Sequence, residues 1–175
     1  KEVFANASGW VVEAGSTQSG NDNTSADPEI LVAIGSLATS LGAADITEID
    51  WITTAADKSD GFSLSVRVFF NEPVDVDTTS GVPYCAITNG NEGSGSGRGP
   101  HNLPYVSGTG TNELVFTLAI AAANAATNAD DVLVVGTNAL ALNSGTIKDA
   151  GTSSASTITS SSAIGTAAGS ITVTA

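Results

Sequence analysis

Apolar and polar side chains alternate along two stretches of the chain, residues 61–73 and 114–120. The first, GFSLSVRVFFNEP, places an apolar residue at every second position from Phe62 to Phe70. The second repeats the pattern from Leu114 to Ile120. A period of two residues is typical of a strand with one buried face. We therefore predict two strands that face a common core.

Shorter apolar runs bounded by turn residues predict further strands. They cover residues 46–53, 74–77, 82–88, 132–135, 140–142, 146–147 and 171–174. Asn71, Glu72 and Pro73 are expected to interrupt the central strand before residues 74–77 resume it. The glycine-rich residues 89–102 predict an exposed loop. This series of short strands and turns predicts an all-β, immunoglobulin-like antiparallel sandwich over residues 45–175.

Residues 1–44 differ in character and predict an N-terminal arm with one helix over residues 28–41. Asp27 is a suitable N-cap and Pro28 suits the first helical position. Large apolar residues then recur at spacings of four, three and four: Ile30, Ile34, Leu37 and Leu41. The alternative is two short strands, EILVAI and SLATSL, separated at Gly35.

The arm also carries large apolar residues beside a polar segment, GSTQSGNDNTSA. Phe4 and Trp10 either fold back on the domain or dock on a neighbouring molecule. Together with the apolar positions of the predicted helix they form a candidate partner-docking set: Phe4, Trp10, Ile30, Ile34, Leu37 and Leu41.

The composition and net charge of the chain argue against several classes of function. Charged residues are 13% of the chain and the net charge is −13, so binding to nucleic acid is not expected. The chain contains no apolar run of 18 residues, and we expect no membrane span. Its single cysteine, Cys85, excludes an intrachain disulfide. With one cysteine and one histidine, His101, a zinc site is not expected either.

Acidic residues gather at the ends of predicted strands, where calcium ligands often lie. They are Asp50, Glu72, Asp75, Asp77, Asp130, Asp131 and Asp149. The spacing of a calcium-binding loop is missing, so a solvated acidic rim is the simpler interpretation and we predict no cofactor, with calcium as the alternative. The sequence has no G-x-S-x-G motif, and we predict no enzymatic activity. Trp51, Tyr84 and Tyr105 are candidates for stacking on sugars.

Three sequence motifs resemble the immunoglobulin-like repeat modules of large bacterial surface and adhesin-type proteins. These are FNEPV at residues 70–74, YVSGTGTNELVF at residues 105–116 and LALNSGTIKDAG at residues 140–151. The resemblance covers residues 45–152. It implies a sandwich fold and a location outside the cytoplasm. Such modules usually occur in tandem arrays, whereas this chain holds one copy. Similar sandwiches occur on bacteriophage virions as decoration or fibre proteins.

The sequence therefore favours a structural protein on the surface of a larger assembly. Our first hypothesis is a virion decoration or cement protein. Its partners would be a capsid or other shell protein, or sister subunits in a homo-oligomer, reached through the N-terminal arm. The alternative is a secreted surface-layer or adhesin module of the cell surface, stiffened by calcium and binding glycans.

Overall fold

The chain divides into two compact units, Lys1–Leu41 and Gly42–Ala175. The computed structural model describes residues 2–6, 9–33, 42–90 and 100–175 of these units. Each unit is considered by itself below.

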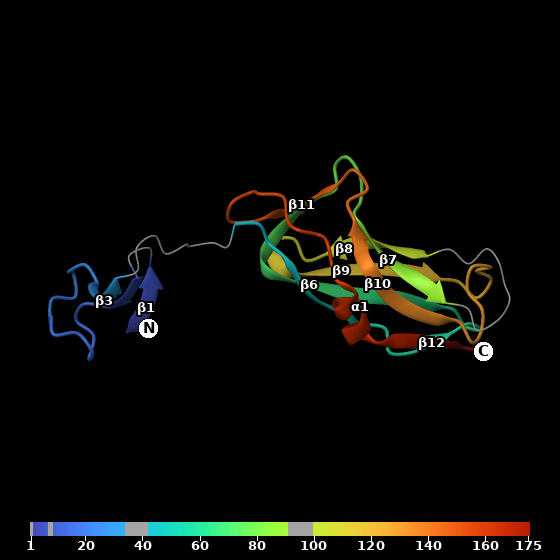
Figure 1. Ribbon diagram of the computed structural model, residues 1–175, viewed down its shortest axis with the longest axis horizontal. Coiled ribbons are helices and arrows are strands. Elements are labelled where there is room, and N and C mark those ends of the chain that lie inside the picture. Colours follow the sequence, from blue (N-terminus) through green and yellow to red (C-terminus); the bar gives the residue numbers. More distant parts are fainter. Residues whose placement is uncertain (1, 7–8, 34–41, 91–99) are drawn as a thin grey trace. The chain divides into compact units, whose positions relative to one another are not determined.

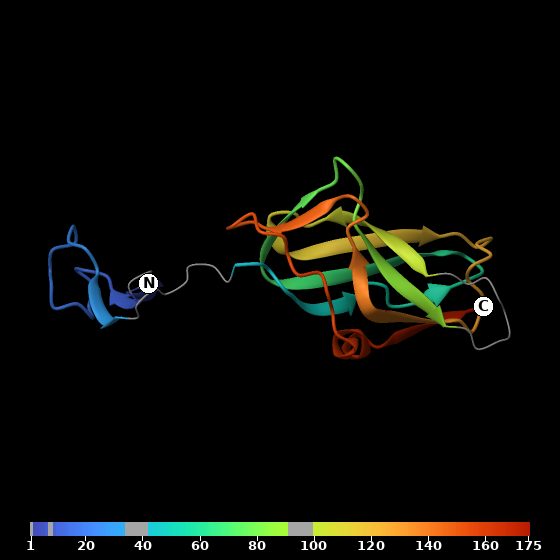
Figure 2. The same ribbon diagram turned by 45° about the horizontal axis from the view of Figure 1, so that its top comes forward.

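The larger unit is a β-sandwich whose two sheets lie one over the other (Figure 1, Figure 2). One sheet has the order β4–β6–β9–β8 and the other the order β7–β10–β12. The bounds of these strands are β4 Ile46–Trp51, β6 Phe62–Asp77, β7 Tyr84–Gly90, β8 His101–Ser107, β9 Thr111–Ile120, β10 Val132–Ala141 and β12 Ser170–Thr174. This is the arrangement of the seven strands in constant-type immunoglobulin domains. The all-β sandwich predicted from the sequence is confirmed.

Strand β8 connects the two sheets. Its first half pairs with β7, for example Ile87 with His101, and its second half pairs with β9, where Tyr105 lies opposite Phe116. Two short strands extend the edges: β5 (Ala56–Asp57) runs parallel to β12, and β11 (Thr146–Asp149) pairs with the end of β6.

The alternating pattern of residues 62–70 builds the core as expected. Leu64, Val66, Val68 and Phe70 of β6 are buried, and Leu114 and Phe116 of β9 are buried beside them. The opposite sheet contributes a second buried layer: Cys85, Ile87, Leu133 and Val135. Each fully buried side chain of this size contributes roughly 1.5–3 kcal/mol by leaving water. The sandwich therefore has a hydrophobic core of its own.

The predicted interruption at Asn71, Glu72 and Pro73 is wrong, because β6 continues through these residues to Asp77. Residues 71–73 instead mark the point at which the strand that pairs with β6 changes. Before this step β6 pairs with β4, after it with β11, and its register with β9 shifts between Phe69 and Val74. Pro73 is tolerated because the strand is irregular at this point.

The smaller unit is a three-stranded antiparallel sheet in the order β1 (Val3–Asn6), β2 (Gly9–Val12) and β3 (Glu29–Ala33). The helix predicted over residues 28–41 is wrong for residues 29–33, which form strand β3 by pairing with β2. The remaining part, with Ile34, Leu37 and Leu41, lies outside the described residues.

One helix, α1 (Ser162–Ala168), lies against β10 and β4 (Figure 1). It begins at the end of residues 152–163, a stretch rich in serine and threonine for which the sequence predicted no helix. Its Gly165 is buried, and a Cβ there would meet the carbonyl oxygen of Val135 at 2.2 Å. A residue without a side chain is therefore required for this close approach.

Candidate docking surface

The three-stranded sheet exposes most of its large apolar side chains. The exposed fractions are 41% for Val3, 48% for Trp10, 57% for Ile30 and 54% for both Leu31 and Val32. Three other apolar side chains of this unit are buried among the described residues: Val11, Val12 and Ala14. We call Val3, Trp10, Ile30, Leu31 and Val32 the apolar sheet surface.

The register of the strands places these residues beside one another. Trp10 of β2 lies opposite Val32 of β3, and Val11 lies opposite both Ile30 and Phe4. Residues directly opposite in an antiparallel pair share one face of a sheet. Trp10 and Val32 therefore lie together on the face opposite to that of Ile30. Between these pairs β3 carries an extra residue, Leu31, which forms a bulge.

Hydrogen bonds hold acidic residues at one end of this sheet. The side chain of Ser19 donates to Glu29 Oε1 at 2.9 Å, and Thr17 donates to Glu2 Oε2 at 2.7 Å. The backbone N–H of Glu13 donates to the carbonyl of Glu2 at 2.8 Å. Glu2, Glu13 and Glu29 thus follow one another across the ends of the three strands. The apolar sheet surface has an acidic rim at this end.

Of the predicted docking residues, the structure describes Phe4, Trp10 and Ile30. It brings them into one sheet, with Trp10 and Ile30 about half exposed and Phe4 partly buried. The sequence analysis missed Val3, Leu31 and Val32. The continuous apolar run of residues 30–33 could have indicated them, because consecutive apolar residues in a strand put apolar groups on both faces.

Three acidic residues of the sandwich, Asp57, Asp77 and Asp149, accept hydrogen bonds within their own turns. In the described part of the chain no three His, Cys, Asp or Glu side chains gather as metal ligands do. Asp149 Oδ1 accepts from the hydroxyl and the backbone N–H of Thr152, at 2.7 and 2.5 Å. These hydrogen bonds lower the pKa of Asp149, the side-chain bond most. Asp77 and Asp57 accept in the same way from Thr79 and Ser59, and their pKa values are lowered as well.

A buried polar cluster joins strands β7 and β8 to the loop at residues 121–131. Asn89 donates to Asp131 Oδ2 at 3.0 Å, and the hydroxyl of Thr127 lies 3.0 Å from His101 Nε2. Burial lowers the pKa of His101, and nearby Lys58 lowers it further, whereas Asp131 acts in the opposite direction. These contacts attach the loop to the end of the sandwich.

Cys85 lies in the apolar core, where burial raises the pKa of its thiol from 9.0 to about 12. The hydrogen-bond partner found for His101 is Thr127. A nucleophilic cysteine requires an ionised thiol, so Cys85 acts as a small apolar core residue.

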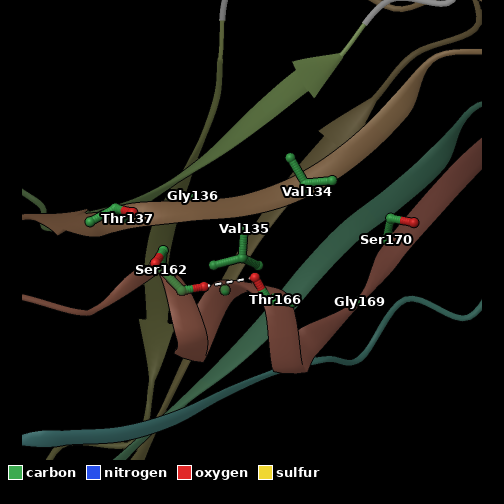
Figure 3. A pocket seen from close by; sticks show the side chains of 9 residues that line it. Val134, Val135, Gly136, Thr137, Ser162, Thr166, Gly169 and Ser170 are labelled. Atoms are coloured by element: carbon green, nitrogen blue, oxygen red, sulfur yellow. Dashed lines mark hydrogen bonds between the residues drawn. The ribbon is translucent and has the colours of Figure 1, made fainter.

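A groove of about 420 Å³ lies between β10 and α1 (Figure 3). Val134, Val135 and three glycines line it together with four hydroxyl side chains: Thr137, Ser162, Thr166 and Ser170. The hydroxyl of Thr166 donates a hydrogen bond to the carbonyl oxygen of Ser162 at 2.9 Å. The lining has no titratable side chain, so none of its side chains can act as a general acid or base at neutral pH. The aromatic candidates Trp51, Tyr84 and Tyr105 lie outside it.

Several residues of the motifs at residues 70–74 and 105–116 stabilise turns of the sandwich. Tyr105 packs edge-on against Phe116, with 5.9 Å between ring centroids, and its hydroxyl accepts from the N–H of Thr109 at 2.9 Å. The hydroxyl of Thr109 accepts in turn from the N–H of Val76 at 2.9 Å. Asn71 exchanges two hydrogen bonds with the backbone of Asp45. These contacts therefore stabilise the fold.

Comparison with known proteins finds no matching family model, no similar curated protein and no similar solved structure. The described residues include no helix that is long and apolar enough to cross a membrane.

Proposed function

We propose that this protein is a non-enzymatic structural component of the outer surface of a larger assembly, best explained as a capsid decoration or cement protein of a bacteriophage. In this proposal the N-terminal sheet docks on the shell and the sandwich faces solvent. The observation that carries the proposal is the apolar sheet surface, whose residues Trp10 and Val32 share one face of the sheet and are about half exposed.

The physical argument is that the N-terminal unit cannot bury its own apolar residues. A small three-stranded sheet is only marginally stable in water when its apolar face is not covered. Here more large apolar side chains are exposed than buried among the described residues of the unit. A partner that covers the surface would therefore stabilise the unit as it binds.

The binding free energy expected from burying these side chains is modest, which suits a protein that attaches to a shell at many sites. Fully burying one such side chain contributes roughly 1.5–3 kcal/mol, so covering the exposed halves of Trp10 and Val32, which share one face, contributes about 1.5–3 kcal/mol. A micromolar complex corresponds to about 8 kcal/mol. One face of the sheet would supply part of this free energy, and the acidic rim favours a partner with basic residues beside its apolar site.

An alternative proposal is a secreted surface-layer or adhesin module that binds glycans. The groove between β10 and α1 supports it, because an uncharged lining of hydroxyl and backbone groups suits a neutral, hydroxyl-rich ligand. Calcium stiffening would belong to the same proposal. The two proposals place the protein in different material, on virus particles or on the cell envelope.

Fractionation of the source material tests both. We expect the chain to sediment with particles far larger than its own 17.3 kDa. The double variant Trp10→Ser/Leu31→Ser should be released as free protein, whereas the control Val82→Ser/Val106→Ser, at exposed positions of the sandwich, should remain bound. Sedimentation with envelope fragments would favour the alternative. A wild-type chain found free of both fractions contradicts both proposals.

A further inference from the structure

Charged side chains are missing from the strands of one sheet of the sandwich. Strands β7, β10 and β12, with β8 beside them and helix α1 at their edge, contain no Asp, Glu, Lys or Arg. Over the whole chain 13% of the residues are charged. The opposite sheet carries such residues on its strands, for example Glu48 on β4, Arg67 on β6 and Glu113 on β9. We call the outer side of β8, β7, β10 and β12 the uncharged face.

The strand register shows which side chains the uncharged face presents. Tyr84, Ala86 and Thr88 of β7 point outward, because the residues between them are buried in the core. Pro104 of β8 lies opposite Tyr84, and Val134 of β10 lies opposite Thr88. Residues directly opposite in an antiparallel pair share one face of a sheet. The face therefore has an apolar part at Tyr84 and Pro104 and continues to Val134.

The groove beside β10 adjoins this face and forms its polar part. Strand β12 pairs with β10 as far as Ser170, which lies opposite Val134, and beyond this point α1 lies beside β10. Three exposed residues with hydroxyl groups border the groove between these elements: Thr137, Ser162 and Ser170 (Figure 3). A hydroxyl group both donates and accepts hydrogen bonds. The groove therefore matches a ligand whose own polar groups do both.

The spacing of the two parts indicates the size of the ligand. Tyr84 and Thr88 are four residues apart on β7, which is about 14 Å at about 3.4 Å per residue. Val134, opposite Thr88, lines the groove. The groove alone, at about 420 Å³, is within the roughly 300–1,000 Å³ of small-molecule sites. A ligand that fills it and also reaches Tyr84 therefore contains several linked units.

Charge decides which kind of ligand fits the uncharged face. An anionic polymer would find no Lys or Arg on these strands, and the net charge of −13 would repel it. A protein partner is less well matched, because protein interfaces are enriched in Arg and aromatic residues. A neutral glycan has apolar C–H surfaces for Tyr84 and Pro104 and hydroxyl groups for the groove.

We propose that the uncharged face binds a neutral glycan chain, with one sugar unit in the groove between β10 and α1 and another part of the glycan on Tyr84 and Pro104. This inference rests on the alternative form of the proposed function, whose ligand it specifies as an uncharged polysaccharide. The N-terminal sheet takes no part in this binding.

Titration with defined oligosaccharides tests the ligand class. The neutral probes are cellohexaose, maltohexaose, mannohexaose and chitohexaose, and hexagalacturonate is an anionic control with the same number of units. Isothermal titration calorimetry of the full chain should show saturable binding of at least one neutral probe with a Kd below ~1 mM, and no binding of hexagalacturonate. Trp51 supplies a second signal, because its indole N–H donates to the carbonyl of Gly169, which lines the groove, at 3.5 Å. In a Trp10→Phe background the fluorescence of Trp51 should change as the probe binds.

Matched variants locate the site. Tyr84→Ala should weaken binding of the neutral probe at least ~5-fold. Thr137→Ala and Ser170→Ala each remove one hydroxyl from an exposed position and should weaken binding about 3- to 10-fold. Ser63→Ala is the control, since it removes a hydroxyl from an exposed position of β6 in the opposite sheet and should leave the Kd unchanged.

Three results would overturn the inference: no binding of any neutral probe, equally tight binding of hexagalacturonate, or the same Kd in all four variants. A wild-type dimer that Tyr84→Ala dissociates, with no glycan bound, would assign the face to a second copy and overturn it too. A chain that sediments with particles or envelope fragments but binds no glycan removes this inference alone. A chain that binds a neutral glycan but is found free of both fractions supports the inference and contradicts the proposed location.

Discussion

Phe69 and Phe70 are neighbours on β6, but their side chains lie on opposite faces of the sheet. Phe70 is 2% exposed and belongs to the core, whereas Phe69 lies on the outer face with the Arg67 guanidinium 5.6 Å from its ring centre. Replacing each by alanine removes the same atoms from adjacent positions. The pair therefore tests directly whether the two-residue period of the sequence decides burial.

The two substitutions should differ strongly in cost. Phe70→Ala leaves a cavity in a close-packed core, and such changes cost about 3–5 kcal/mol. Phe69→Ala loses part of the transfer free energy of a half-buried ring, about 1 kcal/mol, and a surface cation–π contact of about 0.5–1 kcal/mol. We expect Phe70→Ala to be at least ~2 kcal/mol more destabilising than Phe69→Ala.

Urea unfolding followed by tryptophan fluorescence measures this difference. A Trp10→Phe background leaves Trp51 as the only indole, and Trp51 packs against the sandwich core. Equal costs at the two positions, with unchanged dependence on urea concentration, would refute the assignment of faces and with it the sandwich core described above.

Two further predictions concern the sandwich. Gly108 has φ 115°, and an added Cβ would meet the carbonyl oxygen of Glu113 at 2.0 Å, so Gly108→Ala should lower the free energy of unfolding by about 2–4 kcal/mol. Gly110→Ala, which meets no atom within 4 Å, should cost about 1 kcal/mol in the same urea titration. Because the pKa of His101 is lowered in the folded state, its stabilising contribution is complete above pH 6.5 and is lost as the pH falls through the folded pKa. Melting temperatures measured from pH 7.5 to 5 should therefore fall less steeply for His101→Gln than for the wild type, and parallel curves would contradict this.

The sandwich could be predicted because its signal is local. The alternation from Phe62 to Phe70 depends on nothing beyond neighbouring residues, and it gave both the strand and its buried face. Strand β3 was predicted only as the alternative to a helix, because ILVA fits the apolar stripe of a helix as well as a strand. Its pairing with β2, some twenty residues earlier in the chain, decided between the two.

Other features depend on contacts that a single sequence does not display. Helix α1 contains one large apolar residue, Ile164, and its position depends on the contact of Gly165 with β10. The buried polar cluster joins His101 to Thr127 and Asn89 to Asp131, pairs that lie 26 and 42 positions apart in the chain. Their residue types gave no signal because no local spacing connects them.

The carboxylates of the sandwich also bear on which part of the chain could bind a cation or a partner. The sequence offered Asp77 and Asp149 as calcium candidates, and each already accepts hydrogen bonds from its own turn. A cation at either carboxylate would have to replace bonds that lower the pKa of that group. These acidic residues therefore stabilise turns, as the motif residues Tyr105 and Asn71 do. In the proposed function, selectivity for a partner is therefore assigned to the N-terminal sheet, where Trp10 and the residues Ile30, Leu31 and Val32 of β3 are about half exposed.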